Sequence, residues 1–298
     1  MTEKDNIKQH ITLGLTAFLD ILGFGARVAA AEHAEDVAAI AQAVEWIQEA
    51  FEFRGKESWQ EEVHAHARKT VLAFSDSVVV HVPLVSDATK FQGTFDPFLS
   101  EIYDLAIAQA ACVARGLFLR GGLDLGWWYR NGDVLVSQGL ARAYRAEGLA
   151  NVPVIALTED IYQYLSEHPD RANYAEEIEP LGRLLRHYTG PRSDGTSQKF
   201  WFIDYIGTYV RNVEWQPGSR EQLEEYKRAT PERKDELWMA GCHENQQRWL
   251  AHHARTIEAA FGRAGSPSVA QKYRWLSLYH NEIALQYGFD GDCLCRIS

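Results

Sequence analysis

Positive charge is scarce in this chain. It carries 30 lysines and arginines against 41 aspartates and glutamates, which gives a formal net charge of −11 at pH 7. This balance argues against a broad, nonspecific surface for nucleic acid, although it leaves room for a small basic pocket that holds one nucleotide. Long apolar runs are missing too, because none reaches the roughly 18–20 residues that a helix needs to cross a bilayer. We therefore expect no direct membrane insertion.

Cysteine is also sparse. The four cysteines, Cys112, Cys242, Cys293 and Cys295, are scattered, and the closest pair forms only a Cys-x-Cys near the C-terminus. The polar N-terminal residues lack the basic-then-apolar order of a signal peptide, so we expect a cytoplasmic protein with reduced thiols. A zinc site built from Cys293, Cys295 and a histidine is the alternative.

The composition is that of a folded protein, with 46% hydrophobic and 24% charged residues in 298. Short apolar runs predict strands, and apolar residues at spacings of three and four predict helices. Strands are predicted at residues 11–19, 69–74, 78–82, 117–126, 133–136 and 152–157, and helices at about 30–53, 97–114 and 137–149. This order indicates an α+β fold, a mostly antiparallel sheet with its helices on one face.

The character of the sequence changes at a turn-rich segment, residues 191–197. Beyond it, helical patterns dominate at about 219–262 and 267–288. We therefore expect a main domain at residues 8–190 and a helical C-terminal extension at residues 191–298 that packs on it.

Two aspartates stand at the ends of apolar, strand-like runs. Asp20 follows residues 11–19 and precedes a turn with Gly23 and Gly25, and Asp76 lies in a tight hairpin turn between two predicted strands. A carboxylate among apolar side chains is costly to desolvate, so it needs a partner such as a cation. Carboxylate oxygens suit magnesium or manganese, which usually arrive with substrate phosphates. The pair predicts a metal–phosphate site; for one aspartate alone, a turn cap is the alternative.

A further strand carries a double glycine, Gly121 and Gly122, which often marks a close approach by another backbone or a ligand. Arg120 precedes it and is either a phosphate ligand or a surface ion pair. Asp124 lies on the same strand, and its alternation with leucines suggests a different face and a structural role.

Four segments in order resemble a known family. They are FLDILGF at residues 18–24, FSDS at 74–77, RGGLDLG at 120–126 and SQGLARAYRAE at 137–147. The set resembles the catalytic domain of the class III adenylyl and guanylyl cyclases, and within them most the bacterial pyrimidine cyclases of the Pycsar anti-phage systems. The resemblance covers roughly residues 11–160. It implies a ferredoxin-like catalytic domain and a homodimer with each active site between two subunits.

The resemblance assigns roles to particular residues. Asp20 and Asp76 would hold two Mg²⁺ or Mn²⁺ ions and act in catalysis, with Ile21 as a further metal ligand. Arg145, at the position of a transition-state arginine, would stabilise phosphate charge; a solvated helix residue is its alternative. The substrate would contact Ile21, Leu22, Gly23, Phe24 and Arg120.

Departures from the purine cyclases point to another base. Leu72 stands four residues before Asp76, where purine cyclases usually carry a purine-reading lysine, and Ala141 replaces an asparagine. The implied function is conversion of UTP or CTP to the 3′,5′-cyclic monophosphate and pyrophosphate, a second messenger for a separate effector in anti-phage defence. The alternatives are a purine cyclase that makes cyclic AMP or GMP, and an inactive module that binds a nucleotide without turnover.

Overall fold

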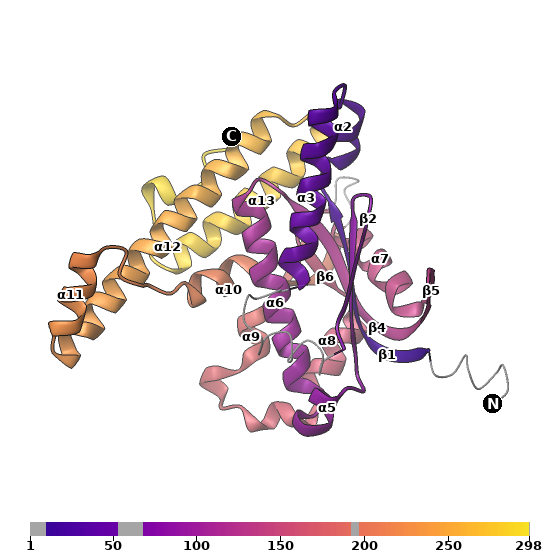
Figure 1. Ribbon diagram of the computed structural model, residues 1–298, viewed down its shortest axis with the longest axis horizontal. Coiled ribbons are helices and arrows are strands. Elements are labelled where there is room, and N and C mark those ends of the chain that lie inside the picture. The colour runs from indigo at the N-terminus through magenta and orange to yellow at the C-terminus, as the bar shows by residue number, and fades with distance from the viewer. Residues whose placement is uncertain (1–9, 53–67, 192–196, 298) are drawn as a thin grey trace. The chain divides into compact units, whose positions relative to one another are not determined.

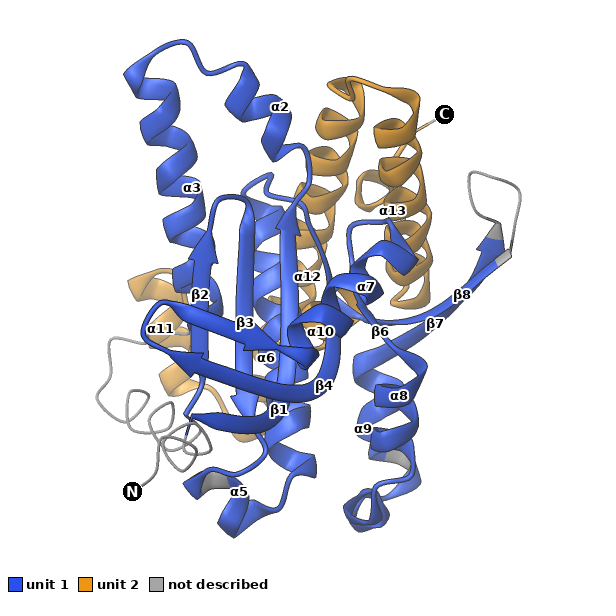
Figure 2. Ribbon diagram, turned by 90° about the vertical axis from the view of Figure 1, so that its right-hand side faces the viewer, with its two compact units in different colours: residues 1–205 blue, residues 206–298 orange. Residues whose placement is uncertain are grey.

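The computed structural model describes residues 10–52, 68–191 and 197–297. The chain divides into two compact units, Met1–Tyr205 and Ile206–Ser298 (Figure 2). The boundary expected at residues 190/191 differs from this division, because the strands on either side of the turn-rich segment pair with each other within the first unit.

The first unit is built on a sheet of eight strands among the described residues (Figure 1). The strands are β1 (Ile11–Ile21), β2 (Thr70–Phe74), β3 (Ser77–Pro83), β4 (Leu119–Asn131), β5 (Val134–Ser137), β6 (Ile155–Leu157), β7 (Leu185–Pro191) and β8 (Ser197–Ile203). Their order is β2-β3-β1-β4-β6-β8-β7, with β5 paired to β4. The β4–β6 pair is parallel and the other pairs are antiparallel.

Helices of the first unit pack on both faces of the sheet. They are α2 (Phe24–Ala29), α3 (Ala34–Glu52), α5 (Asp87–Gln92), α6 (Phe95–Ala114), α7 (Gln138–Ala150), α8 (Glu159–Ser166) and α9 (Pro180–Leu184), with short 3-10 helices at Pro169–Asn173 and Glu176–Ile178. In Figure 1, α3 and α6 lie on one side of the strands and α7 lies on the other. The predicted α+β class is confirmed, but the helices are not confined to one face.

Glycine explains the position of α7. A side chain at Gly122 of β4 would collide with the α7 backbone at Ala143, and one at Gly126 would collide with Gly139. The missing side chains let the helix lie directly on the strand. Phe18, Val79, Trp128 and Ala143 form a buried cluster between them, on which Leu72, Leu135 and Leu140 pack.

The observed elements differ from the predicted ones mainly at their ends. β1 runs two residues further than expected, so Asp20 lies inside the strand. The helix predicted at 30–53 is α3, and a short α2 precedes it. The strand predicted at 152–157 is not the last of the sheet, because β7 and β8 follow it.

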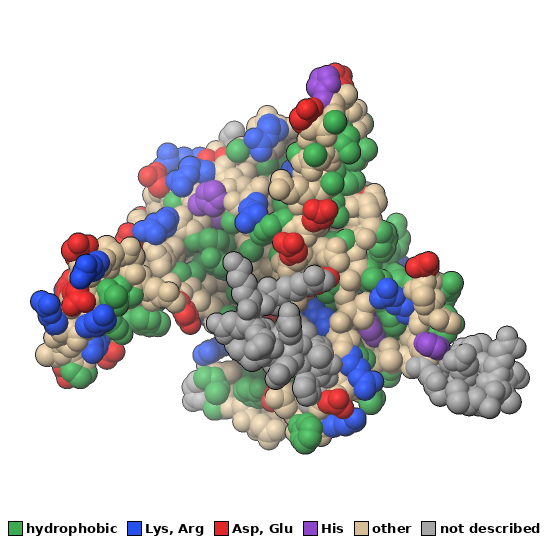
Figure 3. Space-filling model, viewed as in Figure 1, with side chains coloured by type: hydrophobic (Ala, Val, Ile, Leu, Met, Phe, Trp, Pro, Cys, Tyr) green, Lys and Arg blue, Asp and Glu red, His purple; other side chains and the backbone are tan. Residues whose placement is uncertain are grey.

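The described part of the second unit is helical, as predicted. Its elements are α10 (Tyr205–Asn212, which begins in the first unit), α11 (Arg220–Arg228), α12 (Pro231–Gly262), α13 (Pro267–Gln286) and a 3-10 helix at Gly291–Cys293. The helix predicted at 219–262 is broken because Thr230 caps α12 and Pro231 opens it. Figure 3 shows acidic and basic side chains interleaved over α11, where Arg228 pairs with Glu224.

The core of the second unit contains a row of stacked rings. Tyr209, Trp249, His253 and His280 follow one another with centroids 4.4, 4.8 and 4.8 Å apart. The Nδ1 atoms of the two histidines lie 2.9 Å apart, and His280 Nε2 donates to the Cys293 carbonyl at 2.7 Å. Burial lowers the pKa of His280 to about 4, so both rings are neutral at pH 7.

The four cysteines are buried and free. The Cys293 and Cys295 thiols donate to the backbone carbonyls of Gln247 and Ala254. The described residues contain no group of three side chains that could hold a metal ion, so the zinc alternative gains no support. No described helix has both the length and the apolarity to cross a membrane.

Candidate active site

Asp20 and Asp76 meet at one end of the sheet. Asp20 is the second-last residue of β1, opposite Ser77 of β3 and Arg120 of β4. Asp76 belongs to the two-residue turn between β2 and β3, as predicted. The Ile21 N–H donates to the Asp76 carbonyl at 3.0 Å, which ties this turn to the end of β1. Strand pairing therefore places both carboxyl groups side by side.

The turn that carries Asp76 depends on its other residue. Ser75 has a φ of 56°, in the left-handed region that few residues other than glycine adopt. Two-residue hairpin turns require a positive φ at their first central residue, because only then does the turn match the twist of the strands. Ser75 thus accepts the strained conformation that fixes the direction of the Asp76 backbone.

The environment of Asp20 opposes its negative charge. Burial raises the pKa of Asp20, the hydrogen bond and charge of Arg120 lower it, and the neighbouring carboxyl group of Asp76 raises it again, with a net upward shift. Its side chain is 14% exposed. A half-hidden carboxylate beside a second one is an arrangement that a cation stabilises.

Arg120 supplies part of that positive charge. Its Nε lies 2.7 Å from Asp20 Oδ2 and also 2.7 Å from Glu147 Oε1. Its Nη1 donates to Asn151 Oδ1 at 3.4 Å. The single Nε–H is directed at Asp20, so Glu147 holds the guanidinium by charge rather than through this hydrogen bond. The ion pair proposed for Arg120 is therefore present, but its partners belong to the site.

Glu147 is the site residue that sequence reasoning missed. It is 6% exposed, and its backbone N–H lies beside Gly122, two residues from Arg120. Glu147 follows Ala143 by four residues on α7, and residues at this spacing lie on one face of a helix. This spacing was the signal in the sequence that places Glu147 on the face of α7 turned toward Gly122.

The turn after β1 is only partly available to a ligand. The amides of Ile21 and Leu22 already donate, to the Asp76 carbonyl at 3.0 Å and the Phe118 carbonyl at 2.8 Å. Gly23 has a φ of 79° and precedes α2, as its lack of a side chain permits. Residues 21–24 were predicted to line the triphosphate. Within this set, the amides of Gly23 and Phe24 take no part in these two hydrogen bonds.

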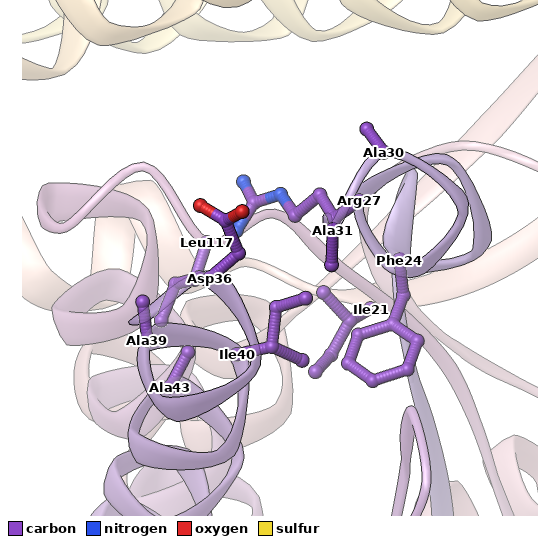
Figure 4. A pocket seen from close by; sticks show the side chains of 10 residues that line it. All are labelled: Ile21, Phe24, Arg27, Ala30, Ala31, Asp36, Ala39, Ile40, Ala43 and Leu117. Atoms are coloured by element: carbon purple, nitrogen blue, oxygen red, sulfur yellow. The ribbon is translucent and has the colours of Figure 1, made fainter. Parts of the chain in front are cut away.

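A pocket of about 330 Å³ opens beside this turn (Figure 4). Ile21 and Phe24 line it together with Leu117 and with small or apolar residues of α3 and of the link between α2 and α3. Arg27 reaches across it and donates to the Gly116 carbonyl at 3.3 Å. Figure 4 shows the Arg27 and Asp36 head groups on the same side of the pocket.

Arg145 lies elsewhere. It is exposed on α7 and lines a separate pocket of about 240 Å³ with Asp124, Thr158 and Asp160. Asp124 is buried and stands two residues from Gly122 on β4, on the face that α7 covers. Side chains alternate between the two faces of a strand, so residues 120, 122 and 124 share one face. The prediction that Asp124 lies on a different face from Arg120 was therefore wrong.

Leu72, at the position of the purine-reading lysine, is partly buried and packs on the cluster of Phe18, Val79, Trp128 and Ala143. This position of the sheet thus carries apolar packing and no hydrogen-bonding head group.

The donor atoms at the turn fit a divalent cation. Asp20 and Asp76 offer carboxylate oxygens, and Mg²⁺ commonly binds one or two carboxylates and takes its remaining ligands from water and substrate phosphates. The described residues add no third acidic, histidine or cysteine ligand, which this mode of binding does not require.

No protein-family model and no curated protein matches this sequence. Among solved structures, the chain is similar to a bacterial light-regulated adenylyl cyclase, with 13% identity over 67% of this chain and 94% of that one and a TM-score of 0.37. It is similar to a class III adenylyl cyclase-like ATP-binding protein from Pseudomonas aeruginosa, with 13% identity, 58% and 39% coverage and a TM-score of 0.38.

A third similar structure is the catalytic core of a rhodopsin-guanylyl cyclase with converted specificity in complex with ATPαS, with 14% identity, 65% and 96% coverage and a TM-score of 0.35. These neighbours are cyclases or cyclase-like. Their identities and TM-scores are low, so we base the function of this chain on its own site residues.

Proposed function

We propose that this chain is a nucleotide cyclase that converts UTP or CTP to the 3′,5′-cyclic monophosphate and pyrophosphate with Mg²⁺ or Mn²⁺. The observation that carries the proposal is the meeting of Asp20 and Asp76 at the end of β1, directly before the Gly23 turn. The four ordered motifs described above add support, since both aspartates belong to them.

The reaction joins the ribose 3′-oxygen to the α-phosphorus and breaks the bond from that phosphorus to pyrophosphate. The hydroxyl proton is released to water. Two bound cations would lower the pKa of the attacking hydroxyl and neutralise the charge of the leaving group. Asp20 and Asp76 would hold these ions near the triphosphate end of the substrate, and the Gly23 and Phe24 amides can approach a phosphate oxygen because the turn carries no side chain at Gly23.

Arg120 prepares the site for the cation. While the site holds no cation, the guanidinium neutralises Asp20 at 2.7 Å. When Asp20 turns to a cation, Glu147 is already 2.7 Å from the same Nε and can take over the guanidinium. A buried charge therefore keeps a partner in both states.

A pyrimidine substrate is supported by the packing of Leu72. A purine-reading lysine is replaced by a leucine inside an apolar cluster, so this position offers no hydrogen bond to a purine ring. The place of the product as a messenger in anti-phage defence, read by a separate effector, rests on the Pycsar-like motifs. We propose cytoplasmic action for the same reason.

A homodimer is part of the proposal. Arg145 does not lie with Asp20 in one chain but on an exposed part of α7. In a dimer with active sites between subunits, Arg145 of one protomer would serve the carboxylates of the other.

The test is to incubate the purified full chain with each of the four ribonucleoside triphosphates and Mn²⁺ and to identify products by mass spectrometry. We expect cyclic UMP or cyclic CMP, lost in Asp20→Asn and in Asp76→Asn. Asp133→Asn is the matched control, because Asp133 is exposed in the turn between β4 and β5. Cyclic AMP or GMP alone would overturn the pyrimidine substrate and favour the purine cyclase.

A second candidate is an inactive nucleotide-binding module. The ion pair between Arg120 and Asp20 favours it, since the guanidinium occupies an oxygen that a cation needs. Binding of a triphosphate with no cyclic product from any of the four nucleotides would decide for this candidate.

A further inference from the structure

A second pocket lies at the opposite end of β1 from the carboxylate pair. It measures about 410 Å³, and its lining includes Thr12 of β1, Thr70 of β2, His81 of β3 and Trp128 of β4. Figure 2 shows the two ends of β1, one running toward α2 and the other lying by the β4–β5 hairpin. Thr12 and Asp20 are eight residues apart on one strand, or about 26 Å. A ligand here does not touch Asp20 of its own chain.

The floor of this pocket is rigid and uncharged. His81 is 2% exposed, and its two ring nitrogens lie 3.1 Å from the Thr12 hydroxyl and 3.0 Å from the Thr16 hydroxyl. Its ring stacks on Trp128, with centroids 4.5 Å apart and planes within 8°. Burial lowers the pKa of His81 to about 4, so the ring stays neutral near pH 7.

The rim is positively charged. Arg68, just before β2, and Arg130, near the end of β4, both line the pocket and are both exposed. Neither guanidinium has an ion-pair or hydrogen-bond partner among the described residues. β2 and β4 are separated by β3 and β1, a spacing of about 14 Å across the sheet. The strand register places Arg130 a further four residues along β4 from the row of Arg68, so the two arginine backbones lie roughly 19 Å apart, on opposite sides of the pocket.

The described lining of this pocket has no acidic side chain. None of the described residues around the pocket is aspartate or glutamate, although the chain as a whole carries a net charge of −11. Thr70 and Asn131 add hydroxyl and amide groups to the lining. Two guanidinium forks that have no partner among the described residues, together with neutral donors, form a donor set suited to phosphate oxygens, because guanidinium binds phosphate through paired, charge-assisted hydrogen bonds.

We propose that this pocket binds a phosphate-bearing small molecule, held between Arg68 and Arg130 over the His81–Trp128 floor. The site is separate from the carboxylate pair and does not depend on the proposed cyclase activity. Its ligand is recognised by the phosphate group, whether that group is inorganic or part of a nucleotide.

The test is isothermal titration calorimetry of the full chain with inorganic pyrophosphate and with UMP, in EDTA so that no cation bridges the probe to Asp20 and Asp76. We expect saturable binding of at least one of the two probes, weakened roughly tenfold or more by Arg68→Gln and by Arg130→Gln. If UMP binds and pyrophosphate does not, the ligand is a nucleotide; the reverse result makes it an inorganic polyphosphate.

Two controls separate this site from general electrostatics and from the carboxylate site. Arg263→Gln removes an exposed arginine in the second unit, and Asp76→Asn changes the carboxylate pair; both should leave binding intact. Equal weakening by Arg263→Gln, loss of binding in Asp76→Asn, or no saturable binding of either probe would overturn the proposal. Uridine is the neutral control, and binding of uridine as tight as that of UMP would refute recognition of the phosphate.

Discussion

Arg120 has a single Nε–H and two carboxylate oxygens at 2.7 Å from its nitrogen, one on Asp20 and one on Glu147. The hydrogen bond goes to Asp20, and Glu147 stands as a second acceptor at the same distance. At the scale of single residues, the affinity of the proposed cation site would therefore depend on how easily the guanidinium leaves Asp20.

Glu147→Gln should weaken Mn²⁺ binding. Without the Glu147 charge, Arg120 loses its alternative partner and holds Asp20 more firmly, so the cation must break a stronger ion pair. We expect an affinity about fivefold lower, as for an ion pair of about 1 kcal/mol, measured from the electron paramagnetic resonance signal of free Mn²⁺ in the presence of UTP. The exposed Glu159→Gln is the matched control. Unchanged affinity in Glu147→Gln would contradict this role.

Ser75 offers a test of the turn that carries Asp76. Its φ of 56° suits a valine least of all, because a β-branched side chain clashes in the left-handed region. We expect Ser75→Val to lower the free energy of unfolding by about 1–2 kcal/mol, measured by urea denaturation. Ser75→Gly, which adopts this φ freely, should change it by less than about 0.5 kcal/mol. Equal effects of the two substitutions would show that the strain lies elsewhere.

Local sequence patterns indicated where Asp20 and Asp76 lie in the fold, but not that Glu147 lies beside Arg120. Asp20 and Asp76 follow apolar strand patterns and stand beside turn residues, which are local signals. Glu147 lies 27 residues beyond Arg120 in the chain, and its approach depends on Gly122 accepting the α7 backbone. Contacts of this kind depend on how a helix packs on a strand, and periodicity does not contain that information.

At the scale of elements, α12, α13 and the chain after them meet through two neutral histidines. His253 and His280 are fully buried, and burial lowers the pKa of both, that of His280 to about 4. Protonation of either ring would place a charge in the core and disturb the bond from His280 to the Cys293 carbonyl.

The second unit should therefore lose stability in acid. The folded pKa of His280 lies below the unfolded value of about 6.5, so the unfolded chain binds more protons and stability falls as the pH drops from about 6.5 to about 4. We expect the free energy of unfolding to fall by on the order of 3 kcal/mol through His280. The measurement is urea denaturation at a series of pH values, followed by hydrogen exchange of the α12 backbone amides. His280→Gln should flatten this dependence, and the exposed His33→Gln should not. An unchanged slope in His280→Gln would refute the mechanism.

Element prediction from the sequence succeeded where patterns were local. The β2–β3 hairpin and α6 were expected within a few residues of their observed bounds. β7 and β8 were missed because β7, LRHYTGP, has little apolar alternation and the turn-rich segment after it resembled a domain boundary. The pairing of β8 with β6 joins residues about 45 positions apart, such as Ala156 and Phe202, which are too distant in the chain to fall within one sequence pattern.

At the scale of the whole molecule, the proposed homodimer makes a quantitative prediction. Asp76→Asn and Arg145→Gln would each disable both sites of a symmetric dimer. In a mixed dimer, one site would carry both changes and the other neither, because each site takes its aspartates and its arginine from different protomers. Random mixing makes half of the dimers mixed, each with one intact site of two.

Equal mixing of the two inactive variants should thus restore about a quarter of the wild-type cyclase activity. The variants should be refolded or expressed together, so that subunits exchange. Mixing Asp76→Asn with Asp20→Asn is the control. In the proposed dimer one protomer supplies both aspartates of a site, so each site of this mixed dimer has one changed aspartate and no activity returns. No recovery in the test pair would contradict the assignment of Arg145 to the opposite protomer, and recovery in the control would show instead that the two aspartates come from different protomers.

The pairing between β6 and β8 is short. β1 and β4 are joined along eleven residue pairs, whereas β6 and β8 share only two, Ala156 with Phe202 and Leu157 with Trp201. Strand pairing therefore connects the β7–β8 hairpin to the rest of the sheet through only these two residue pairs. Under a mechanical pull on the C-terminal end of the first unit, this pairing would open first, and the strands that carry Asp20, Asp76 and Arg120 would bear load only after the hairpin had come away.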